Sequence, residues 1–272
     1  MTLRPNDVRF GFGDNWLNFA ELIDEGRIVE AECSLQRLCG RDRLDDLRLI
    51  DIGSGSGLSS LAARRLGARV HSFDYDDDSV ACTAWLRERQ RPADTNWSVE
   101  QGSILDPSYL AALGTFDIVY SWGVLHHTGA LAEALSRAAS LVDVQGLFIF
   151  ALYRKTSLCG AWTLEKRWYA GASPGARAWA RRLYISAMKL NDRVHGRDFN
   201  AYVTSYAKSR GMSFEHDVHD WLGGYPYESI TAVDVAACMD RLGLEPVRSF
   251  VTRAGLGLFG SGCDEYVYRR TG

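Results

Sequence analysis

The sequence predicts an α/β fold in which the strands of a parallel sheet alternate with helices. Three observations support this prediction: apolar runs of strand length recur along the chain, patterns of helical periodicity separate them, and one run ends in an acid followed by alternating glycines. Continuous apolarity is typical of parallel strands, because helices cover both faces of such a sheet. The chain has 272 residues, so we expect an additional element beside a single nucleotide-binding sheet.

The first predicted strand leads into a glycine-rich turn. Asp51 stands near the end of this strand, and Gly53, Gly55 and Gly57 follow at alternate positions. Glycines let the backbone turn tightly and approach a ligand closely, and the first turn of the next helix presents N–H groups without partners. Asp74 follows a second strand, at about the separation at which an acid binds ribose hydroxyls. The sequence therefore predicts a crevice that fits a nucleoside.

The later elements continue the alternation of strands and helices. Acids at positions 76–78 begin a helix, because negative charge favours the N-terminal end of a helix. Thr231 and Asp234 form a capping box for a helix that ends at Gly243. The predicted strands cover residues 47–52, 70–73, 97–100, 116–121, 146–153, 247–251 and 265–268. The predicted core helices cover residues 58–66, 76–89, 130–141 and 231–243.

Composition and charge are those of an ordinary globular enzyme. The chain is 46% hydrophobic with a net charge of −3, and no apolar run approaches the roughly 18 residues of a membrane span. The first seven residues lack the apolar stretch of a signal peptide, so a cytoplasmic location is expected. Six cysteines without a Cys-x-x-Cys pair predict reduced thiols rather than a zinc site or a disulfide framework, and no metal is implied.

A glycine turn alone is weak evidence, because sites for NAD, FAD and S-adenosylmethionine (SAM) all use one. Here the acid just before the first glycine and the Gly-x-Gly-x-Gly spacing resemble motif I of the class I SAM-dependent methyltransferases. Residues 45–153 and 231–270 are similar to the whole core of that family, a seven-stranded Rossmann-like sheet whose last strand is antiparallel. The resemblance implies that the methionine part of SAM is lined by Asp51, Gly53, Ser54, Gly55 and Gly57.

The same resemblance assigns the nucleoside contacts. It implies that Asp74 binds the ribose and that Tyr75 flanks the adenine, whose edge would meet Gly102, Ser103 and Ile104. Many relatives carry an acid at the position of Ser103, so Asp106 is an alternative partner for the adenine amino group. A simple turn at 102–103 is the structural alternative.

Two further segments are expected at the cofactor. Ser121 and Trp122 begin the motif that follows the fourth strand, and we include both among the cofactor residues. In many relatives a segment before the core folds over SAM, so Phe12, Asn15 and Trp16 are expected to help close the site. Packing of Trp16 and Phe19 on the first helix is the competing account.

The chemical centre is expected in residues 121–129, beyond the fourth strand, where ligands bind in open α/β sheets. This run resembles the post-strand motif of small-molecule O-methyltransferases of the ubiquinone-biosynthesis type. Methyl transfer depends largely on alignment, but a hydroxyl acceptor must lose a proton, and histidine has a suitable pKa. We favour His126 over His127 as the base. In the alternative, both histidines pack against the next helix and the proton goes to water.

Residues 154–230, which we call the insertion, are strongly basic. From residue 154 to residue 212 twelve Lys or Arg stand against three acids, a net charge of +9 that leaves −12 for the remainder. Such asymmetry indicates an anionic partner. The candidates are a lid over an acidic or phosphorylated metabolite, a surface for RNA and a surface for anionic lipid. We favour the lid; in the structural alternative its aromatic residues dock on the core and its basic face is solvated.

Within the insertion, Ser173 and Pro174 predict the start of a helix, in which one apolar stripe contains Trp179, Leu183, Ala187 and Leu190. Residues 219–229 contain two glycines and a proline between large aromatic residues, which predicts a stiff loop and no regular element. This loop would place Tyr225, Tyr227 or Glu228 over the substrate, beside Tyr153 from the fifth strand. Alternatively, the tyrosines bury the loop against the sheet.

The sequence thus predicts a SAM-dependent methyltransferase that acts on an oxygen of a small or medium-sized biosynthetic intermediate, an anionic one being favoured, and releases S-adenosylhomocysteine. The expected parts are an N-terminal segment of helix and loop over the cofactor (1–44), the SAM-binding core (45–153), a basic, aromatic helical lid insertion (154–230) and the end of the core (231–272). RNA or a peptide is the alternative acceptor. An NAD-dependent oxidoreductase and a non-catalytic SAM-binding protein are the alternatives from other classes.

Overall fold

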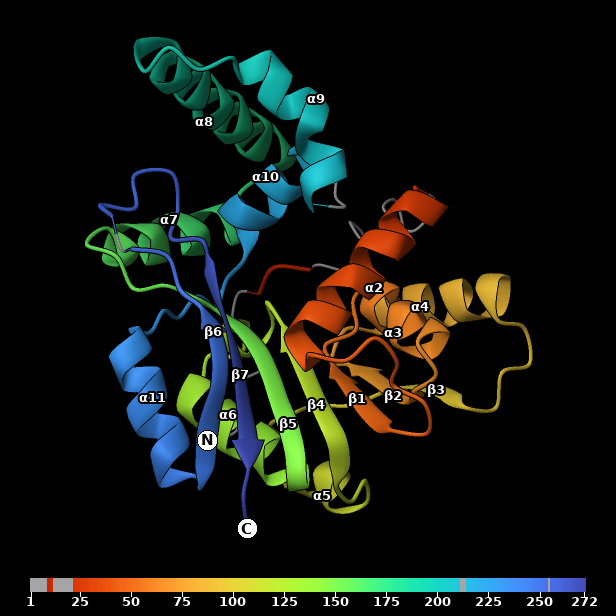
Figure 1. Cartoon of the computed structure of the whole chain (residues 1–272). Coiled ribbons are helices and arrows are strands. Elements are labelled where there is room, and N and C mark those ends of the chain that lie inside the picture. Colours follow the sequence, from red (N-terminus) through yellow and green to blue (C-terminus); the bar gives the residue numbers. More distant parts are fainter. Residues whose placement is uncertain (1–8, 12–21, 211–213, 254) are drawn as a thin grey trace.

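The computed structural model describes residues 9–11, 22–210, 214–253 and 255–272. Its strands are β1 (Arg48–Ile52), β2 (Arg69–Asp74), β3 (Trp97–Gln101), β4 (Phe116–Trp122), β5 (Val142–Tyr153), β6 (Leu244–Phe250) and β7 (Cys263–Arg270). They form one seven-stranded sheet in the order β3-β2-β1-β4-β5-β7-β6 (Figure 1). Only β7 runs antiparallel to its neighbours β5 and β6. The predicted sheet, including its antiparallel last strand, is therefore confirmed.

Helices cover both faces of the sheet. On one face lie α2 (Glu25–Cys39), α3 (Leu58–Arg65) and α4 (Asp77–Gln90), and on the other lie α5 (Pro107–Ala111), α6 (Leu131–Ser140) and α11 (Ala232–Arg241). Adjacent residues of a strand face opposite cores, so Leu49 packs under the first group of helices and Ile50 under the second. Strands buried on both faces explain the continuous apolar runs of the sequence.

Local signals fix where two of these helices begin. The Asp76 carboxylate accepts hydrogen bonds from the N–H groups of Asp78 and Ser79 and so caps α4. The Thr231 hydroxyl oxygen accepts the N–H of Asp234 at 3.1 Å, which is half of the predicted capping box for α11. Caps of this kind satisfy N–H groups that have no partner within the helix.

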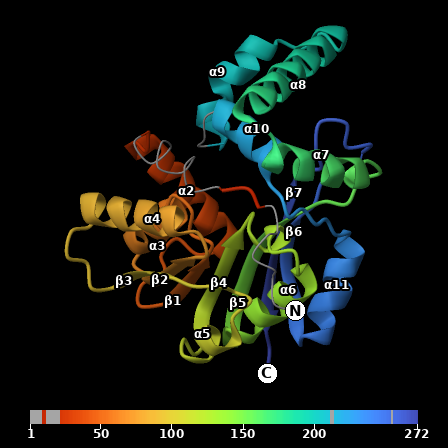
Figure 2. The same ribbon diagram turned by 180° about the vertical axis from the view of Figure 1, so that it is seen from behind.

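The insertion folds into four helices beyond the carboxyl edge of the sheet. They are α7 (Cys159–Gly171), α8 (Pro174–Val194), α9 (Phe199–Arg210) and α10 (Phe214–Gly223). Figures 1 and 2 show α7 and α10 next to the sheet, whereas α8 and α9 extend away from it. Tyr169 of α7, Tyr206 of α9 and Val218 of α10 are the centre of a third apolar cluster, separate from the two cores of the sheet.

The prediction of no regular element in residues 219–229 is wrong for the first part of that run. α10 continues to Gly223, because Val218 and Leu222 lie one turn apart and both are buried in the cluster of the insertion. The irregular part begins at Gly224. The glycine pair therefore ends a helix instead of extending a loop.

All six cysteines are free in the structure. Cys39, Cys82 and Cys159 are buried, and burial raises the pKa of the Cys39 and Cys82 thiols to about 12. None of the helices that the structure describes combines the length and the apolarity that a membrane crossing requires.

Candidate active site

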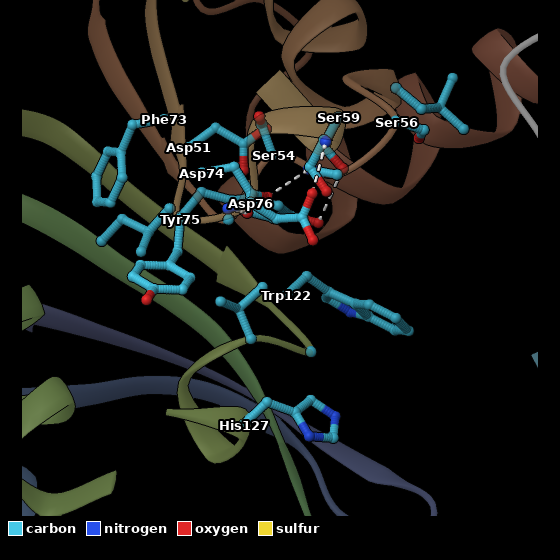
Figure 3. A pocket seen from close by; sticks show the side chains of 18 of the residues that line it. Asp51, Ser54, Ser56, Ser59, Phe73, Asp74, Tyr75, Asp76, Trp122 and His127 are labelled. Carbon is cyan, nitrogen blue, oxygen red and sulfur yellow. Dashed lines mark hydrogen bonds between the residues drawn. The ribbon is translucent and has the colours of Figure 1, made fainter. Parts of the chain in front are cut away.

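A cavity of about 1000 Å³ opens at the carboxyl ends of β1, β2 and β4, where the strand order reverses. In Figure 3 the side chains of Asp51, Ser54 and Asp74 lie on one side of it, and Trp122 and His127 lie on the other. The predicted site residues in its lining are Asp51, Gly53, Ser54, Gly55, Asp74, Tyr75, Gly102, Ser103, Ile104, Trp122, His127 and Tyr225. The lining does not include Gly57, Ser121, His126, Tyr153, Tyr227 or Glu228.

The glycine turn needs glycine for two separate reasons. Gly53 and Gly57 have φ angles of +76° and +78°, a conformation that L-residues with side chains rarely adopt. A Cβ on Gly53 would also lie 2.4 Å from Cγ1 of Val124, in the segment after β4. A Cβ on Gly57 would lie 3.1 Å from Thr83 of α4. The turn is thus packed between β4 and α4.

Buried hydroxyl groups hold this turn in place. Thr83 Oγ1 donates to the carbonyl of Gly55 at 3.0 Å, so Ser54 Oγ must donate to Thr83 in the 2.9 Å contact between them. Ser121 Oγ donates to the carbonyl of Ile52 at 3.1 Å and is fully buried. Ser121 therefore links β4 to β1 instead of lining the cavity.

Asp74 connects the end of β2 to the glycine turn. One carboxylate oxygen accepts the N–H of Gly55 and the other accepts the N–H of Asp76, each at 3.0 Å. Burial raises the pKa of Asp74 to about 6, against the opposite effect of these backbone hydrogen bonds. Each oxygen keeps further lone pairs, so the carboxylate can still accept a ligand hydroxyl.

Asp51 ends a chain of buried hydrogen bonds below the turn. Trp97 Nε1 donates to Ser72 at 2.9 Å, and Ser60 Oγ donates to Asp51 at 2.5 Å. Because the Ser60 proton points to Asp51, Ser72 must donate to Ser60 across their 2.6 Å contact. All protons of this chain thus point toward the carboxylate. Burial nevertheless raises the pKa of Asp51 to about 7.

The residues predicted at the adenine differ in their exposure and in the hydrogen bonds that they already form. Tyr75 is 60% exposed, and the guanidinium carbon of Arg9 lies 5.3 Å from its ring centre. Ser103 Oγ accepts the N–H of Leu105 at 3.1 Å, so it stabilises a turn. Asp106 caps α5 through its carboxylate and stands outside the cavity lining. The proposed substitution of Asp106 for the missing acid thus finds no support in this geometry.

His127 is the histidine that lines the cavity. Its Nδ1 lies 2.7 Å from the carbonyl oxygen of Pro226, which can only accept, so Nδ1 carries the proton of the neutral ring. Burial lowers the pKa of His127 to about 3, although hydrogen bonds with the backbone of Pro226 and Gly224 act in the other direction. The ring is therefore neutral at neutral pH, and Nε2 is its unprotonated nitrogen.

His126 is fully buried behind its neighbour. Its Nδ1 accepts the N–H of Tyr153 at 3.2 Å, and its ring lies against that tyrosine with centroids 3.9 Å apart. Among the described residues, Nε2 of His126 has no hydrogen-bond partner. Burial lowers the pKa of His126 well below its usual value. The sequence-based preference for His126 as the base thus conflicts with its position, because no described cavity reaches it.

The four residues predicted to contact substrate separate into one that lines the cavity and three that do not. Tyr225 lines it together with Pro226. Tyr153 packs between His126 and Tyr227, with centroids 5.1 Å from the latter. Tyr227 is buried, and its hydroxyl lies 2.9 Å from Ser261 Oγ.

Glu228 has a capping role in the structure. Its carboxylate accepts the N–H of Leu131, the first residue of α6, at 2.9 Å, and its own N–H donates to the carbonyl of His126 at 3.0 Å. An acid at a helix N-terminus is favourable, which explains the position without a substrate.

Several cavity residues have no counterpart among the sequence predictions. α2 contributes six of them, and the segment 9–11 and Glu265 of β7 contribute others. The lining residues of α2 are Arg27, Glu30, Ala31, Cys33, Ser34 and Arg37. Asp24, which caps this helix, was the available signal. Phe12, Asn15 and Trp16 lie outside the described residues.

The chain is similar to known proteins in sequence. A family model described as a methyltransferase domain matches residues 23–205. The ubiquinone biosynthesis O-methyltransferase of Paramagnetospirillum magneticum is 32% identical over 46% of this chain and 49% of its own length. The protein of the same name from Rhizobium etli is 28% identical over 65% of this chain and 75% of its own. The chain spans about half the length of the first curated relatives it matches.

Solved structures resemble the fold at low sequence identity. Magnesium protoporphyrin IX methyltransferase from Synechocystis with bound SAH has a TM-score of 0.53 at 16% identity, over 90% of this chain and 84% of that one. A putative methyltransferase in complex with the Haloferax volcanii Trm112 activator has a TM-score of 0.54 at 13% identity, over 97% and 98%. The family model spans well over half of the chain, and the fold agrees with it. The chain therefore belongs to the methyltransferase-domain family.

Proposed function

We propose that the chain binds SAM in the cavity and transfers its methyl group to an oxygen of a small molecule, with S-adenosylhomocysteine (SAH) as the second product. The observation that carries this proposal is that one cavity holds both the glycine turn with Asp74 and the neutral ring of His127. Family membership supports methyl transfer as the reaction. The name of the relatives, ubiquinone biosynthesis O-methyltransferase, supports an oxygen acceptor.

The chemistry of the lining suits SAM. Ribose hydroxyls need an acceptor, which Asp74 supplies, and an adenine ring needs flat or apolar walls, which Tyr75 and Ile104 supply. The cavity of about 1000 Å³ lies at the upper end of the usual range for ligand sites, roughly 300–1,000 Å³, so it has room for a cofactor and an acceptor together. No phosphate-binding cluster is needed, because SAM has none.

The residues of the chain then have distinct tasks. When bound, SAM supplies a methyl group on a positively charged sulfur. Asp74 binds the ribose, the backbone of Gly53 and Gly55 allows the ligand to approach closely, and Asp51 contributes negative charge near the turn. Trp122, whose indole N–H donates to Glu265 at 3.1 Å, is held in a fixed orientation at the acceptor end. Alignment of the two reactants is the main source of rate in such a displacement.

His127 is proposed as the proton acceptor in place of His126. A pKa of about 3 makes it a weak base, but the acceptor hydroxyl becomes strongly acidic as its oxygen gains the methyl group. A weak base that is neutral at all physiological pH values is therefore sufficient late in the reaction. The hydrogen bond from Nδ1 to Pro226 fixes which nitrogen is basic.

The acceptor is proposed to be a small molecule whose charge is not set by the basic residues of the insertion. Among the described residues of the insertion, only Tyr225 and Pro226 line the cavity, and none of them is a Lys or Arg. An acid-rich lining, which includes Glu30 of α2 and Glu265 of β7, also disfavours an acceptor of high negative charge. The sequence-based preference for an anionic acceptor therefore loses its support.

A methyl-transfer assay with isotope-labelled SAM and a panel of small hydroxylated aromatic compounds tests the proposal. We expect His127→Ala to lower kcat by about a hundredfold to ten-thousandfold, the usual contribution of a general base, and to leave the affinity for SAH within about twofold. His195→Ala is the matched control, because His195 is exposed in the insertion and stands outside the cavity lining.

Three results would change the proposal in different ways. Undiminished kcat in His127→Ala would remove the histidine as base and leave the cofactor site intact. Label on nitrogen or carbon of the product would refute the oxygen acceptor. Binding of SAM with no transfer to any hydroxylated, amine or carbon acceptor would favour a non-catalytic SAM-binding protein.

A further inference from the structure

Helix α8 has two apolar faces, and within the part of the chain that the structure describes only one of them is packed. Tyr184, Ile185 and Met188 on its inner face pack on the apolar cluster of the insertion. On the opposite face lies the predicted stripe, extended by one residue, which we call the outer stripe: Trp179, Leu183, Ala187, Leu190 and Val194. The four large members are 62%, 56%, 63% and 73% exposed, respectively. The predicted stripe thus exists, but it faces solvent.

The outer stripe is long and continuous. It spans one side of the helix from position 179 to position 194, which is about 22 Å at the usual rise of an α-helix. Figures 1 and 2 place α8 at the end of the molecule farthest from the sheet. Single exposed apolar residues are ordinary, but a contiguous exposed patch of this kind indicates a surface for interaction.

Cations border the outer stripe along one flank. Arg182, Lys189 and Arg193 follow one another at helical spacing, and all three are exposed. Among the described residues none of the three forms an ion pair with an acid, and Lys189 lies 5.3 Å from the ring centre of Phe199. Asp192, the one acid of α8, lies toward the inner side and pairs with Arg197.

A hollow lies next to these cations. It has a volume of about 510 Å³ and is lined by Lys189, Arg193, Arg197, Asp198, Phe199 and Asn200. Three cations against one acid give it a positive potential, and it lies at the α8–α9 turn, beside the last residues of the outer stripe. Apolar surface and phosphate-binding charge are therefore adjacent on one exposed helix.

We propose that α8 lies in the plane of an anionic phospholipid surface, with the outer stripe at the boundary of the acyl chains and the three cations at the headgroup phosphates. A long helix with an apolar face, a basic flank and a tryptophan has the features of an interfacial helix. Charge complementarity favours an anionic surface over a second copy of the chain. If two copies met through the outer stripe, their basic flanks would lie close together and repel each other. Attachment to a membrane surface goes beyond the proposed reaction and leaves its chemistry unchanged.

Vesicle sedimentation of the full chain tests the proposal. The probe is a set of vesicles of phosphatidylcholine alone and of phosphatidylcholine with phosphatidylglycerol in equal parts. We expect the wild-type chain to bind only the anionic vesicles and Leu183→Asp/Leu190→Asp to lower the partition coefficient at least about tenfold. Arg182→Gln/Lys189→Gln/Arg193→Gln should lower it by about a hundredfold, since each cation near such a surface contributes a factor of about five.

A matched control uses exposed apolar residues elsewhere in the chain. Val144→Asp/Val233→Asp introduces the same charges at positions that are 61% and 78% exposed, on β5 and α11, and should bind vesicles as the wild type does. SAH binding and circular dichroism confirm that each variant is folded, because all the substituted residues lie outside the cavity lining.

Each other outcome contradicts the proposal. Binding that needs the cations but not the outer stripe would show a purely electrostatic contact. Oligomers of the wild type that dissociate on Leu183→Asp/Leu190→Asp, without vesicle binding, would make a second copy the occupant. Absence of vesicle binding in a wild-type chain that binds SAH would refute the membrane surface and leave the proposed function standing.

Discussion

Asp74 is the residue on which the proposed cofactor site depends most. Its two oxygens accept the N–H groups of Gly55 and Asp76, so it shapes the glycine turn and is also available to a ligand hydroxyl. Burial holds its pKa at about 6, close to physiological pH. A carboxylate accepts hydrogen bonds from a ribose diol better than the protonated acid does. The protonation of Asp74 should therefore change the affinity for the cofactor.

Cofactor affinity should therefore weaken in acid. Above pH 6 Asp74 is charged, and below it the acid is increasingly protonated, so we expect the Kd for SAH to rise by about tenfold per pH unit below this pKa. Asp51, with a pKa raised to about 7, adds to the effect in the same direction. Calorimetric titrations across this range measure it.

Asp74→Asn should bind SAH weakly at every pH. Its Kd should depend less steeply on pH, because only the contribution of Asp51 remains. His127, with a pKa of about 3, should add no acid limb to kcat near pH 6.5. A kcat that falls with a pKa near 6.5 in the wild type and not in His127→Ala would contradict the neutral histidine described above.

Gly53 should tolerate no side chain. Gly53→Ala places a Cβ in the left-handed region and against Val124, and we expect the free energy of unfolding to fall by about 2–4 kcal/mol, from backbone strain and overpacking together. Gly123→Ala is the matched control, because Gly123 has a similar φ of +78° with nothing within 4 Å of an added Cβ. Urea unfolding measures both variants, and equal losses would show that contact with Val124 is unimportant.

The role of a residue in the site was predictable from the sequence where the backbone conformation requires a particular residue type. It was not predictable where the direction of the side chain decides the role. Alternating glycines after an acid suffice to locate the turn. His126 and His127 are adjacent in the short 3-10 turn η1 (Leu125–His127), and which ring reaches the cavity depends on packing of Tyr153 and Pro226 from distant segments. No local pattern contains that information.

At the scale of elements, the cap of α11 is the sharpest local feature that sequence and structure share. Thr231→Ala removes the oxygen that accepts the N–H of Asp234, and we expect a loss of about 1 kcal/mol in the free energy of unfolding. Chemical denaturation measures it, with Thr163→Ala as a control, since that hydroxyl donates within α7 and caps nothing. No difference between the two variants would mean that the cap contributes nothing to stability.

Sheet strands were the most predictable elements and helices at the rim the least. Every strand of the core was anticipated. Burial on both faces gives the inner strands β1, β4 and β5 their apolar runs, whereas the edge strands β3 and β6 are largely exposed. Helix was expected within residues 1–44, but the bounds of α2 were not predicted, because only part of its surface is buried, at Ile28, Leu35 and Leu38, and charges fill the remainder. α10 was mistaken for a loop because its terminal glycines were given more weight than Val218 and Leu222.

α8 shows why an apolar stripe alone cannot say which way a helix faces. The stripe through Trp179 and Leu183 was predictable, and in a compact domain it would face a core. The packed face is instead formed by residues such as Tyr184 and Met188, whose partners lie in α7, α9 and α10. Two apolar faces on one helix need two partners, and the structure supplies one of them.

For the whole molecule, topology explains the position of the cavity better than any single motif does. The strand order reverses between β1 and β4, so the segments that follow these strands diverge and leave space between them. α2 and the segment 9–11 form the remaining walls. The insertion adds a separate apolar cluster. Five of the twelve Lys or Arg of residues 154–212 lie on α8, and none of the described ones lines the cavity.

The central claim is that this cavity binds SAM, and isothermal titration calorimetry of the full chain with SAH tests it most directly. We expect saturable heat with one site per chain and competition by SAM for the same site. Asp74→Asn should bind at least about tenfold more weakly, since it loses a charged acceptor for the ribose. Absence of heat with both SAH and SAM, in a chain that circular dichroism shows to be folded, would contradict the claim.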